Sequence, residues 1–590
     1  MRRDPFRLVI PCLISMVVIL AFGIGCEHPG QESMCGDGTC ADNEECWTCP
    51  EDCACRCGDG VCTYGESCAV CPQDCDCKTL AATPPMGWNS WNRFHCDLDE
   101  NLVRKVASAM VSNGMADAGY RYVNLDDCWQ VDRDASGRIR ADPDRFPNGI
   151  AALAKFVHSL GLRLGIYTCA GTLTCQNRPG SYDHEALDAV TYAEWGVDYV
   201  KVDWCHTEGL EPRQRYAVFR DAIAASGQPM VFSICNWGLN SPWVWGPKTG
   251  HLWRTSIDIF DSFISVLFNF KSTVGLAAFA TPGHWNDPDM LEVGNGGMTE
   301  DESRAQMSLW AIMSAPLIAG NDVRVLDDET RAILLNPEVI AVDQDPLGLQ
   351  GVRIRMYDDG GQVLAKPLSL AGNRAVVLLN PTKEPRTVAV RFEDLGLGPG
   401  PVRVRDLWSR SDLGAFTGEF EADVQAHGVK MVRVQGTEPV PPSGETYVSD
   451  LPFMYAANTL GPVERDRANG GDAPGDGPSL LLGGAGYERG LGVHAASRVL
   501  LYLGGHCNRF LATVGLDDSA GPKASVGFEV LADGRALFQS ERVTPGSSAI
   551  PIDIQVTGYR VLELRVSAAG NDTEGDAADW ADARVVCAGP

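Results

Sequence analysis

The chain contains 590 residues, 45% of them hydrophobic and 21% charged, a composition typical of several folded domains. Lys and Arg total 49 against 77 Asp and Glu, and the resulting net charge of −28 disfavours binding to nucleic acids or anionic lipid surfaces. Twelve of the 22 cysteines lie between Cys35 and Cys77. That density is typical of an oxidising, extracellular environment or of a metal cluster.

The first 25 residues predict export. Arg2, Arg3 and Arg7 precede an apolar run that ends in small residues directly before Cys26, the pattern of a secretory signal. A Cys after small residues is also similar to a bacterial lipoprotein cleavage site, so lipidation of Cys26, a simple signal peptide and an uncleaved anchor all stay open. We expect a bacterial protein that is secreted or anchored in the cell envelope, with membrane contact only through a lipid on Cys26.

Residues 35–77 contain two copies of a 22-residue cysteine-rich unit. Cys35-Gly-Asp-Gly-Thr-Cys40 returns as Cys57-Gly-Asp-Gly-Val-Cys62, and each copy carries six cysteines. Units this small need covalent or metal cross-links to hold a shape. Export favours three disulfides per copy over zinc, with a connectivity that the sequence does not define.

Residues 84–347 alternate between strand-like and helix-like segments, which predicts a (β/α)8 barrel. The eight predicted strands are Met86–Trp91, Tyr120–Asp127, Leu162–Cys169, Val197–Trp204, Pro229–Cys235, His251–Ser256, His284–Leu291 and Ala315–Asn321. Apolar residues at helical spacing predict a helix over Ile150–Leu160. Thr299-Glu-Asp-Glu302 has the pattern of a capping box at a helix start.

The helical period disappears beyond residue 347, and short strands predict an antiparallel β-sandwich over 348–436. Its expected strands are Val352–Met356, Gln362–Pro367, Ala375–Asn380, Thr387–Phe392, Val402–Asp406 and Gly428–Val434. A Pro-rich linker is expected over 437–444, followed by a second β-sandwich over 445–588. The strands expected there are Ser497–Leu503, Phe510–Val514, Phe528–Ala532, Ile550–Val556 and Val561–Val566, and we expect Cys507 to pair with Cys587.

Polar side chains gather at the ends of five predicted barrel strands. They are Asp126 and Asp127, Tyr167, Lys201 and Asp203, Arg254 and Asp258, and Asp287 and Asp289. A single Asp after a strand is more often a turn or helix cap. Barrels, however, carry their chemistry at the carboxyl ends of the strands, so five such ends around one mouth predict an active site.

Paired carboxylates with Lys, Arg and aromatic neighbours suit the cleavage of a glycosidic bond. One carboxylate attacks or supports the oxocarbenium-like centre, and the other protonates the leaving oxygen. Phosphoryl transfer is disfavoured because there is no P-loop motif. No histidine pair at metal-ligand spacing accompanies these aspartates, so we expect neither a metal ion nor a cofactor in the barrel.

The motifs at the strand ends resemble glycoside hydrolase family twenty-seven, the α-galactosidases or melibiases, from about Thr83 to Val434. The matching segments are Met86-Gly-Trp-Asn-Ser-Trp91, Asn124-Leu-Asp-Asp-Cys-Trp129, Tyr199-Val-Lys-Val-Asp-Trp-Cys205, Trp253-Arg254 with Asp258, and Trp285-Asn-Asp-Pro-Asp-Met290. The resemblance implies a retaining double displacement that releases terminal α-D-galactosyl residues from oligo- or polysaccharides.

The resemblance also implies a role for each matching residue. Asp203 is expected to be the nucleophile and Asp258 the general acid/base, and Lys201 is expected to favour the ionised form of Asp203. The expected sugar contacts are Asp126 and Asp127 near O4 and O6, Lys201, Arg254 and Asp289 at other hydroxyls, and Tyr167, Trp91 and Cys175 along the wall. The family's disulfides correspond to Cys96–Cys128 and Cys175–Cys205.

One position departs from the family pattern. After the fifth strand this chain has Asn236, where many members have Glu, and we expect Asn236 to bond the sugar's 2-hydroxyl. Asn is bulkier than the small residue that accompanies N-acetylgalactosamine, so galactose is favoured. An α-N-acetylgalactosaminidase, a β-L-arabinopyranosidase and a non-catalytic cell-surface sugar-binding protein are the alternatives, and the intact Asp203 and Asp258 argue against the last.

The C-terminal block resembles the NPCBM family of carbohydrate-binding modules. The matching segments are Gly490-Leu-Gly-Val-His-Ala495, Phe510-Leu-Ala-Thr-Val-Gly-Leu-Asp-Asp518 and Ala578-Asp-Trp-Ala-Asp-Ala583. Two interpretations of Trp580 and His494 are open: Trp580 stacks on a sugar that His494 bonds, or both pack in the core. The resemblance also allows a calcium ion in this module.

Overall fold

The computed structural model describes residues 80–569 and 572–588. The predicted leader (1–25), Cys26 and the cysteine-rich repeats (35–77) therefore lie outside the described residues. Among the helices of the described part, none is both long and apolar enough to cross a bilayer.

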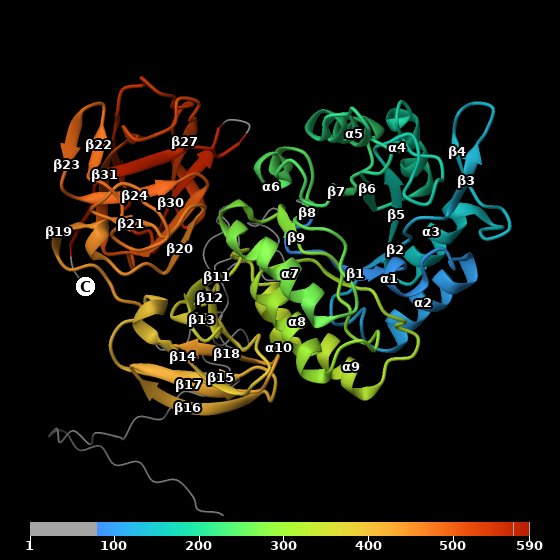
Figure 1. Ribbon diagram of the computed structural model, residues 1–590, viewed down its shortest axis with the longest axis horizontal. Coiled ribbons are helices and arrows are strands. Elements are labelled where there is room, and N and C mark those ends of the chain that lie inside the picture. The colour runs from blue at the N-terminus through green and yellow to red at the C-terminus, as the bar shows by residue number, and fades with distance from the viewer. Residues whose placement is uncertain (1–79, 570–571, 589–590) are drawn as a thin grey trace, which may run out of the picture. The chain divides into compact units, whose positions relative to one another are not determined.

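Eight parallel strands form the barrel in the order β10-β1-β2-β5-β6-β7-β8-β9 (Figure 1). They are β1 (Met86–Asn89), β2 (Tyr122–Asn124), β5 (Arg163–Cys169), β6 (Tyr199–Asp203), β7 (Val231–Cys235), β8 (Leu252–Arg254), β9 (Trp285–Asp287) and β10 (Leu317–Ala319). A parallel bridge between Leu291 and Ala319 links the chain after β9 to β10 and closes the ring. All eight strands lie inside the predicted ranges, so the barrel is confirmed.

Helices follow most of these strands along the chain. They are α1 (Trp91–Phe94), α2 (Glu100–Ser112), α3 (Gly149–Ser159), α4 (Glu185–Trp195), α5 (Pro212–Ser226), α6 (Pro242–Trp245), α7 (Phe263–Thr273), α8 (Glu300–Ile312), α9 (Asp328–Leu334) and α10 (Pro337–Asp343). The predicted capping box at Thr299 and Glu302 is present at the start of α8. A hairpin of β3 (Gln130–Arg133) and β4 (Ile139–Ala141) and the 3-10 turns Gly246–Lys248 and Val274–Phe279 complete the barrel domain.

The two faces of β6 show how the barrel separates structure from chemistry. Val200 and Val202 are fully buried in the large core shared with the helices. Tyr199 instead belongs to a smaller apolar layer of strand residues. Lys201 and Asp203 lie on the same face of β6 as Tyr199, because side chains on one face of a strand repeat every two residues. The layer plugs the amino-terminal end of the strands and consists of Tyr122, Tyr199, Val231, Leu252 and Trp285.

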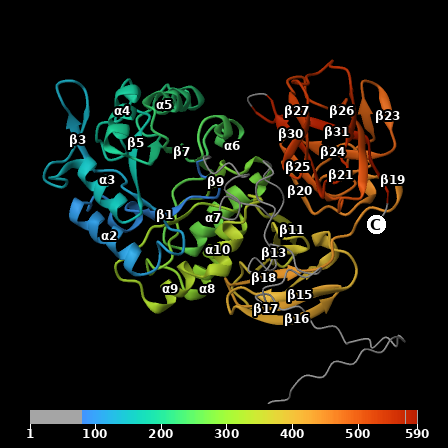
Figure 2. The ribbon, with the colours of Figure 1, turned by 180° about the vertical axis from the view of Figure 1, so that it is seen from behind.

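The chain then forms an antiparallel β-domain (Figure 2). This domain has its own apolar core. Its strands are β11 (Val352–Met356), β12 (Gln362–Pro367), β13 (Asn373–Leu379), β14 (Arg386–Arg391), β15 (Pro401–Asp406), β16 (Ser411–Thr417), β17 (Glu419–Val424) and β18 (Val429–Gln435). Six of them form a sheet in the order β11-β12-β13-β18-β15-β16, and β14 pairs with β17. The sequence analysis did not predict β16 or β17. For β16 the reason is that it is exposed along most of its length and lacks apolar alternation.

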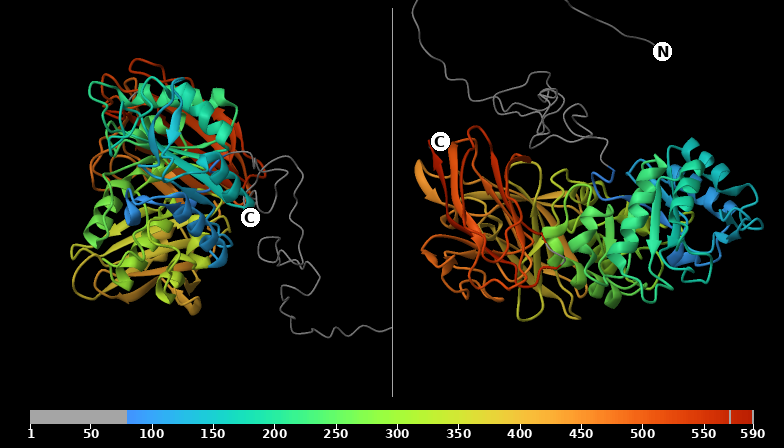
Figure 3. Two further views of the ribbon diagram at one scale, coloured as in Figure 1. Left: turned by 90° about the vertical axis from the view of Figure 1, so that its right-hand side faces the viewer. Right: turned by 90° about the horizontal axis from the view of Figure 1, so that it is seen from above.

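The C-terminal module is a second β-sandwich, coloured orange to red in Figure 3. Its strands are β19 (Gly444–Tyr447), β20 (Tyr455–Asn458), β21 (Glu464–Arg465), β22 (Leu480–Leu482), β23 (Ala485–Tyr487), β24 (Gly490–His494), β25 (Ser497–Tyr502), β26 (Cys507–Leu516), β27 (Val526–Ala532), β28 (Arg535–Gln539), β29 (Ile550–Gln555), β30 (Val561–Ala568) and β31 (Ala577–Cys587). One sheet runs β21-β24-β31-β26-β29 with β19 beside β31, and the other runs β20-β25-β30-β27-β28. The predicted Cys507–Cys587 disulfide joins the neighbouring strands β26 and β31.

Candidate active site

A cavity of about 320 Å³ opens at the carboxyl ends of the barrel strands. It contains all but one of the residues that the sequence predicted for catalysis and substrate binding. These are Trp91, Asp126, Asp127, Tyr167, Cys175, Lys201, Asp203, Arg254, Asp258 and Asp289. They come from loops and strand ends far apart in the sequence, so the barrel itself brings them together.

Asp203 is the last residue of β6 and is almost fully buried in this cavity. The hydroxyl of Tyr167 donates a hydrogen bond of 2.9 Å to its Oδ2, and the Trp204 backbone N–H donates one of 2.8 Å to its Oδ1. Tyr167 on β5 pairs with Lys201 on β6, and Lys201 lies two residues before Asp203. Both carboxylate oxygens are therefore fixed in direction by rigid strand positions.

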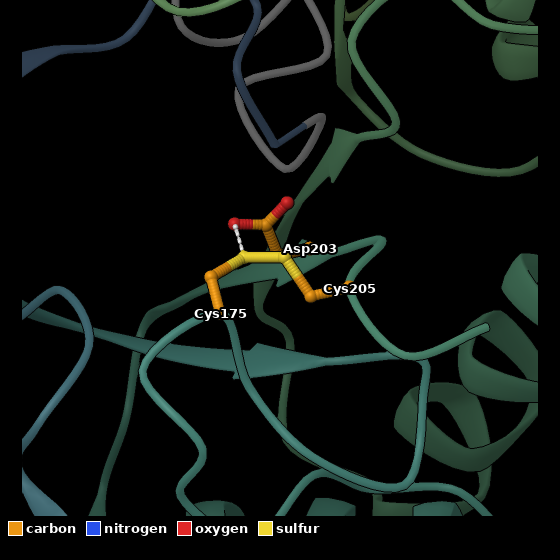
Figure 4. Close-up of side chains that lie close together, drawn as sticks. All are labelled: Cys175, Asp203 and Cys205. Atoms are coloured by element: carbon orange, nitrogen blue, oxygen red, sulfur yellow. Dashed lines mark hydrogen bonds between the residues drawn. A yellow bond between two sulfur atoms is a disulfide. The ribbon is translucent and has the colours of Figure 1, made fainter.

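The disulfide between Cys175 and Cys205 lies directly against Asp203 (Figure 4). Cys175 Sγ is 3.4 Å from Asp203 Oδ2, a packing contact because a disulfide sulfur carries no proton. Gly171 lets the loop after β5 pack closely on the backbone at Cys205, since a Cβ there would lie 2.0 Å from the Cys205 carbonyl oxygen. The predicted pairs Cys175–Cys205 and Cys96–Cys128 are both present.

Asp126 and Asp127 follow β2 and are both buried. Asp126 Oδ2 accepts hydrogen bonds of 2.8 Å from Lys201 Nζ and from Asn89 Nδ2. Asp127 Oδ2 accepts one of 3.0 Å from the Gln176 backbone N–H. Lys201 thus forms its ion pair with Asp126 rather than with Asp203.

Arg254, at the end of β8, joins two carboxylates. Its Nη2 lies 2.8 Å from Asp289 Oδ2 and 3.0 Å from Asp258 Oδ1. Asp289 is buried, and its Oδ2 also accepts a hydrogen bond of 2.9 Å from the Ile259 backbone N–H. The Asp258 side chain is 56% exposed and faces the cavity, so it can be reached by a bound substrate.

The charges around the two candidate catalytic carboxylates shift their pKa values in opposite directions. Burial, together with the charge of Asp258, raises the pKa of Asp203 to about 6, despite the opposing effect of Lys201. Although burial favours the neutral form of Asp258, the Arg254 and Lys201 charges hold its pKa below the usual range. Lys201 lowers the pKa of Asp203 and so favours its ionised form, as expected, while burial and the Asp258 charge keep that pKa above the usual range.

Asn236 does not lie where the sequence placed it. Its side chain is fully buried, it is absent from the cavity wall, and its Nδ2 donates to the Leu239 carbonyl oxygen. The tight turn after β7 folds the amide back on its own loop, and a hydrogen bond from Asn236 to the sugar 2-hydroxyl stays a prediction. Its Oδ1 is buried without a hydrogen-bond partner.

Several cavity residues escaped the sequence analysis. They include Asn92, Arg93, His95, Phe260, Asp261, Glu292 and Asn295. Glu292 is buried and accepts hydrogen bonds from the side chains of Asn92 and Asn295, and burial raises its pKa to about 7. Its position directly after the predicted strand His284–Leu291 was the available signal, since strand ends line the mouth of a barrel.

The residues proposed for sugar binding in the C-terminal module lie in its core. Trp580 is fully buried against Phe510 and Phe528, and it cannot present a free ring face to a sugar. His494 is also buried, and its Nδ1 is 2.9 Å from the Thr459 hydroxyl. The structure therefore favours the core interpretation for both residues.

Within residues 80–569 and 572–588, three or more metal-ligating atoms gather only at Cys175, Asp203 and Cys205. Two of these atoms are the sulfurs of a disulfide, so the group is not a ligand set for a cation. The calcium ion that the resemblance allows in the C-terminal module stays a prediction.

Comparison with known proteins identifies each folded part. Residues 83–345 match the family model described as alpha galactosidase A, and residues 358–434 match the alpha galactosidase C-terminal beta sandwich domain. A probable alpha-galactosidase of Dictyostelium discoideum is 49% identical over 362 residues, which cover 61% of this chain and 94% of the relative. The chain belongs to the α-galactosidase family of glycoside hydrolases.

Two further comparisons agree with this membership. The alpha-galactosidase A of Cellvibrio japonicus is 46% identical over 60% of this chain and 92% of its own length. The crystal structure of alpha-galactosidase I from Mortierella vinacea matches with a TM-score of 0.60 and 38% identity, covering 61% of this chain and 99% of that one. Outside the α-galactosidase region, residues 444–586 match the NPCBM/NEW2 domain.

Proposed function

We propose that this protein is a retaining exo-glycosidase that hydrolyses terminal α-D-galactosyl residues from oligo- or polysaccharides. The observation that carries the proposal is one cavity that holds Asp203 and Asp258 together with the charged groups of Lys201 and Arg254. Asp203 attacks the anomeric carbon, and Asp258 protonates the departing oxygen. Water then hydrolyses the glycosyl-enzyme, with Asp258 acting as general base.

The surroundings of Asp203 suit a nucleophile that must attack in one direction. The hydrogen bonds from Tyr167 and Trp204 hold the carboxylate in place before substrate arrives. Such pre-organisation removes the need to reorient the attacking group during the reaction. The developing positive charge on the sugar favours the ionised form of Asp203.

Substrate binding also favours the protonation state that the reaction needs, with the proton on Asp258. The exposed Asp258 side chain loses water when a sugar covers it, and desolvation raises the pKa of a carboxyl group. At the same time, the cationic sugar centre lowers the pKa of Asp203. Both effects favour a reacting complex in which Asp203 is ionised and Asp258 carries the proton.

The remaining cavity residues provide recognition of one terminal sugar. Asp126, Asp127 and Asp289 offer acceptor oxygens for hydroxyl groups, and Lys201 and Arg254 offer donors. The cavity volume of about 320 Å³ lies at the lower end for small-molecule sites, which supports removal of one residue from a chain end.

A direct assay tests the proposal. The wild-type protein is expected to hydrolyse an aryl α-D-galactoside, and Asp203→Asn is expected to lose that activity while its circular dichroism spectrum stays unchanged. Parallel assays with the N-acetylgalactosaminide and the β-L-arabinopyranoside test the alternative sugars. Binding of galactosides without turnover by the wild type would favour the non-catalytic alternative.

We further infer that the protein is exported and that the C-terminal module binds carbohydrate. The leader sequence and the three disulfides of the described residues support an oxidising compartment, and the NPCBM match supports the module's role. Mass spectrometry of the mature N-terminus tests cleavage before Cys26 and distinguishes a lipidated Cys26 from a simple signal peptide.

A further inference from the structure

One buried side chain lies behind the loop that carries Asp258. Asn269 is on α7, is fully buried and does not line the active-site cavity. Its Nδ2 donates hydrogen bonds to two carbonyl oxygens, that of Pro288 at 2.8 Å and that of Ile257 at 3.2 Å. A side-chain amide has two N–H donors, so Asn269 satisfies both carbonyl groups at once.

These two carbonyl groups directly precede two carboxylates of the site. The carbonyl of Ile257 leads into Asp258, and the carbonyl of Pro288 leads into Asp289. The Asn269 amide therefore joins the loop after β8 to the loop after β9. Both loops belong to the rim of the barrel, where the catalytic and binding groups lie.

The Asp258 side chain depends on its backbone for its position. It is 56% exposed, and its Oδ1 accepts a hydrogen bond of 3.0 Å from Arg254 Nη2. An exposed carboxylate is aimed mainly by the peptide groups on either side of it. The following N–H group donates to Asp289 Oδ2 at 2.9 Å, and the preceding carbonyl, of Ile257, accepts from Asn269.

The loop that carries Asp289 has further supports. Asp289 has a φ of +83°, in the left-handed region that residues other than Gly rarely adopt. Such a conformation persists only where the surrounding structure holds it. Three successive carbonyl groups, of residues 288–290, accept hydrogen bonds from the fully buried side chains of Asn269, Trp310 and Gln306. Of these three side chains, Asn269 is the one that also holds the Asp258 loop.

We propose that Asn269 is a positioning residue for Asp258 in the glycosidase reaction. A general acid must come within about 2.6–3.2 Å of the oxygen that it protonates. A misplacement of about 1 Å, caused by a change away from the reacting atoms, costs on the order of 10²-fold in rate. Because Asn269 lies outside the cavity wall, it acts through the loop that it holds. This inference rests on the proposed galactosidase activity and on the role of Asp258 in it.

The test compares two substrates that differ in their need for a proton. One is a disaccharide of α-galactose linked to glucose, whose leaving oxygen must be protonated, and the other is α-galactosyl fluoride, which needs no general acid. Asn269→Leu has a similar shape and removes both hydrogen bonds. It is expected to lower kcat/KM for the disaccharide about ten- to a hundredfold and to leave the value for the fluoride unchanged. Inhibition by free galactose is also expected to stay unchanged, because Trp310 and Gln306 still hold the Asp289 loop.

A double variant shows whether Asn269 acts through Asp258. Asp258→Asn already removes the general acid, so the addition of Asn269→Leu is expected to cause no further loss of kcat/KM for the disaccharide. If the two residues had independent roles, their losses would multiply instead. A further loss in the double variant would therefore overturn the proposal.

The matched control is Asn380→Leu. Asn380 is also fully buried, and its Nδ2 bridges three carbonyl groups of the β-domain, outside the cavity wall. Both Leu variants are expected to lower the unfolding temperature, but Asn380→Leu is expected to keep wild-type kcat/KM for both substrates. Asn269→Ser, which is too short to bridge the two carbonyls and smaller than Asn, is expected to show the same selective loss if Asn269→Leu does not fold.

The outcomes separate this proposal from the proposed function. Equal losses on the two substrates in a folded Asn269 variant, or no loss on either, would overturn the positioning role. A wild type inactive on both substrates would overturn the galactosidase function itself.

Discussion

The barrel and the C-terminal module use similar residues in different ways. In the barrel, Asp203 ends β6, Asp258 lies in the loop after β8, and both face a cavity. In the module, Trp580 and its neighbour Asp579 lie within the long strand β31 and are fully buried in the sandwich. Position relative to the strand end, more than residue type, decides whether a side chain is available for chemistry.

The catalytic acids of the barrel and Asp579 of the module also differ in their partners. The barrel places Lys201 and Arg254 beside its acids, so the carboxylates keep cationic partners. Burial, reinforced by the nearby charge of Asp517, instead raises the pKa of Asp579 well above its usual range. We therefore expect substitutions that remove a charge to abolish activity in the barrel. In the module, we expect substitutions that disturb packing to lower the free energy of unfolding.

The largest expected effect is the loss of activity in Asp203→Asn. Because the carboxylate is the only group proposed to attack the anomeric carbon, kcat/KM is expected to fall by at least about 10⁴-fold. The amide can still accept the hydrogen bond from the Trp204 N–H. We expect circular dichroism and thermal unfolding to show a folded protein.

A matched control for this variant is Asp132→Asn. Asp132 lies on the exposed hairpin strand β3, outside the cavity wall, and pairs with Arg140. It is expected to retain full activity. Activity near the wild-type level in Asp203→Asn would show that the strand-end cluster does not carry the reaction.

A smaller and more selective effect is expected for Asp258→Asn. General acid catalysis contributes about 10²–10⁴-fold, so kcat/KM for a disaccharide is expected to fall by that factor. Fluoride leaves without a proton, and the loss for α-galactosyl fluoride is expected to be much smaller. Equal losses for the two substrates would assign Asp258 to substrate binding instead of proton transfer.

The sequence allowed most of the barrel site to be predicted, because buried strands that alternate with helices fix which residues meet at the rim. The position of Asn236 outside the cavity wall was not predicted, since the hydrogen bond to Leu239 that turns its amide away depends on loop geometry. Phe260 and Glu292 were missed because neither belongs to a chemically distinctive motif. The strand β31 was missed because its first half is rich in Ala and Asp, which have low strand propensity.

Truncation of Trp580 tests whether this residue stabilises the core of the C-terminal module. Trp580→Ala is expected to cost about 3–5 kcal/mol of the module's free energy of unfolding, because a fully buried indole leaves a cavity. Hydrolysis of α-galactosyl fluoride at moderate temperature is expected to stay at the wild-type level. Calorimetry and steady-state kinetics on the same preparation measure the two quantities.

The reciprocal variant is Trp91→Ala. Trp91 is half-buried at the cavity wall, so its loss is expected to lower activity with little change in unfolding. If Trp580→Ala instead abolished polysaccharide binding while the module's unfolding temperature stayed the same, its ring would have to be accessible, and the contrast between the two regions would fail.

The smallest expected effect is a pH dependence of kcat/KM in the wild type. The reacting form carries one proton on the Asp203–Asp258 pair, and the pKa of about 6 at Asp203 marks where the free enzyme loses that proton. As the pH rises through about 6, the pair becomes fully ionised, and kcat/KM for a disaccharide is expected to decline by about tenfold per pH unit. On the acid side, activity falls only when a second proton binds, at Asp258. That step is expected below the usual pH range of a carboxyl group, because the Arg254 and Lys201 charges lower the pKa of Asp258.

Asp258→Asn reverses the sign of this dependence with α-galactosyl fluoride. That substrate needs no proton, so only the ionised form of Asp203 is required and kcat/KM rises with pH. The variant also removes the Asp258 charge that raises the pKa of Asp203, so the rise is expected to be complete below pH 6. A wild-type profile that stays flat from pH 6 to 8 would show that the two carboxyl groups do not share the catalytic proton.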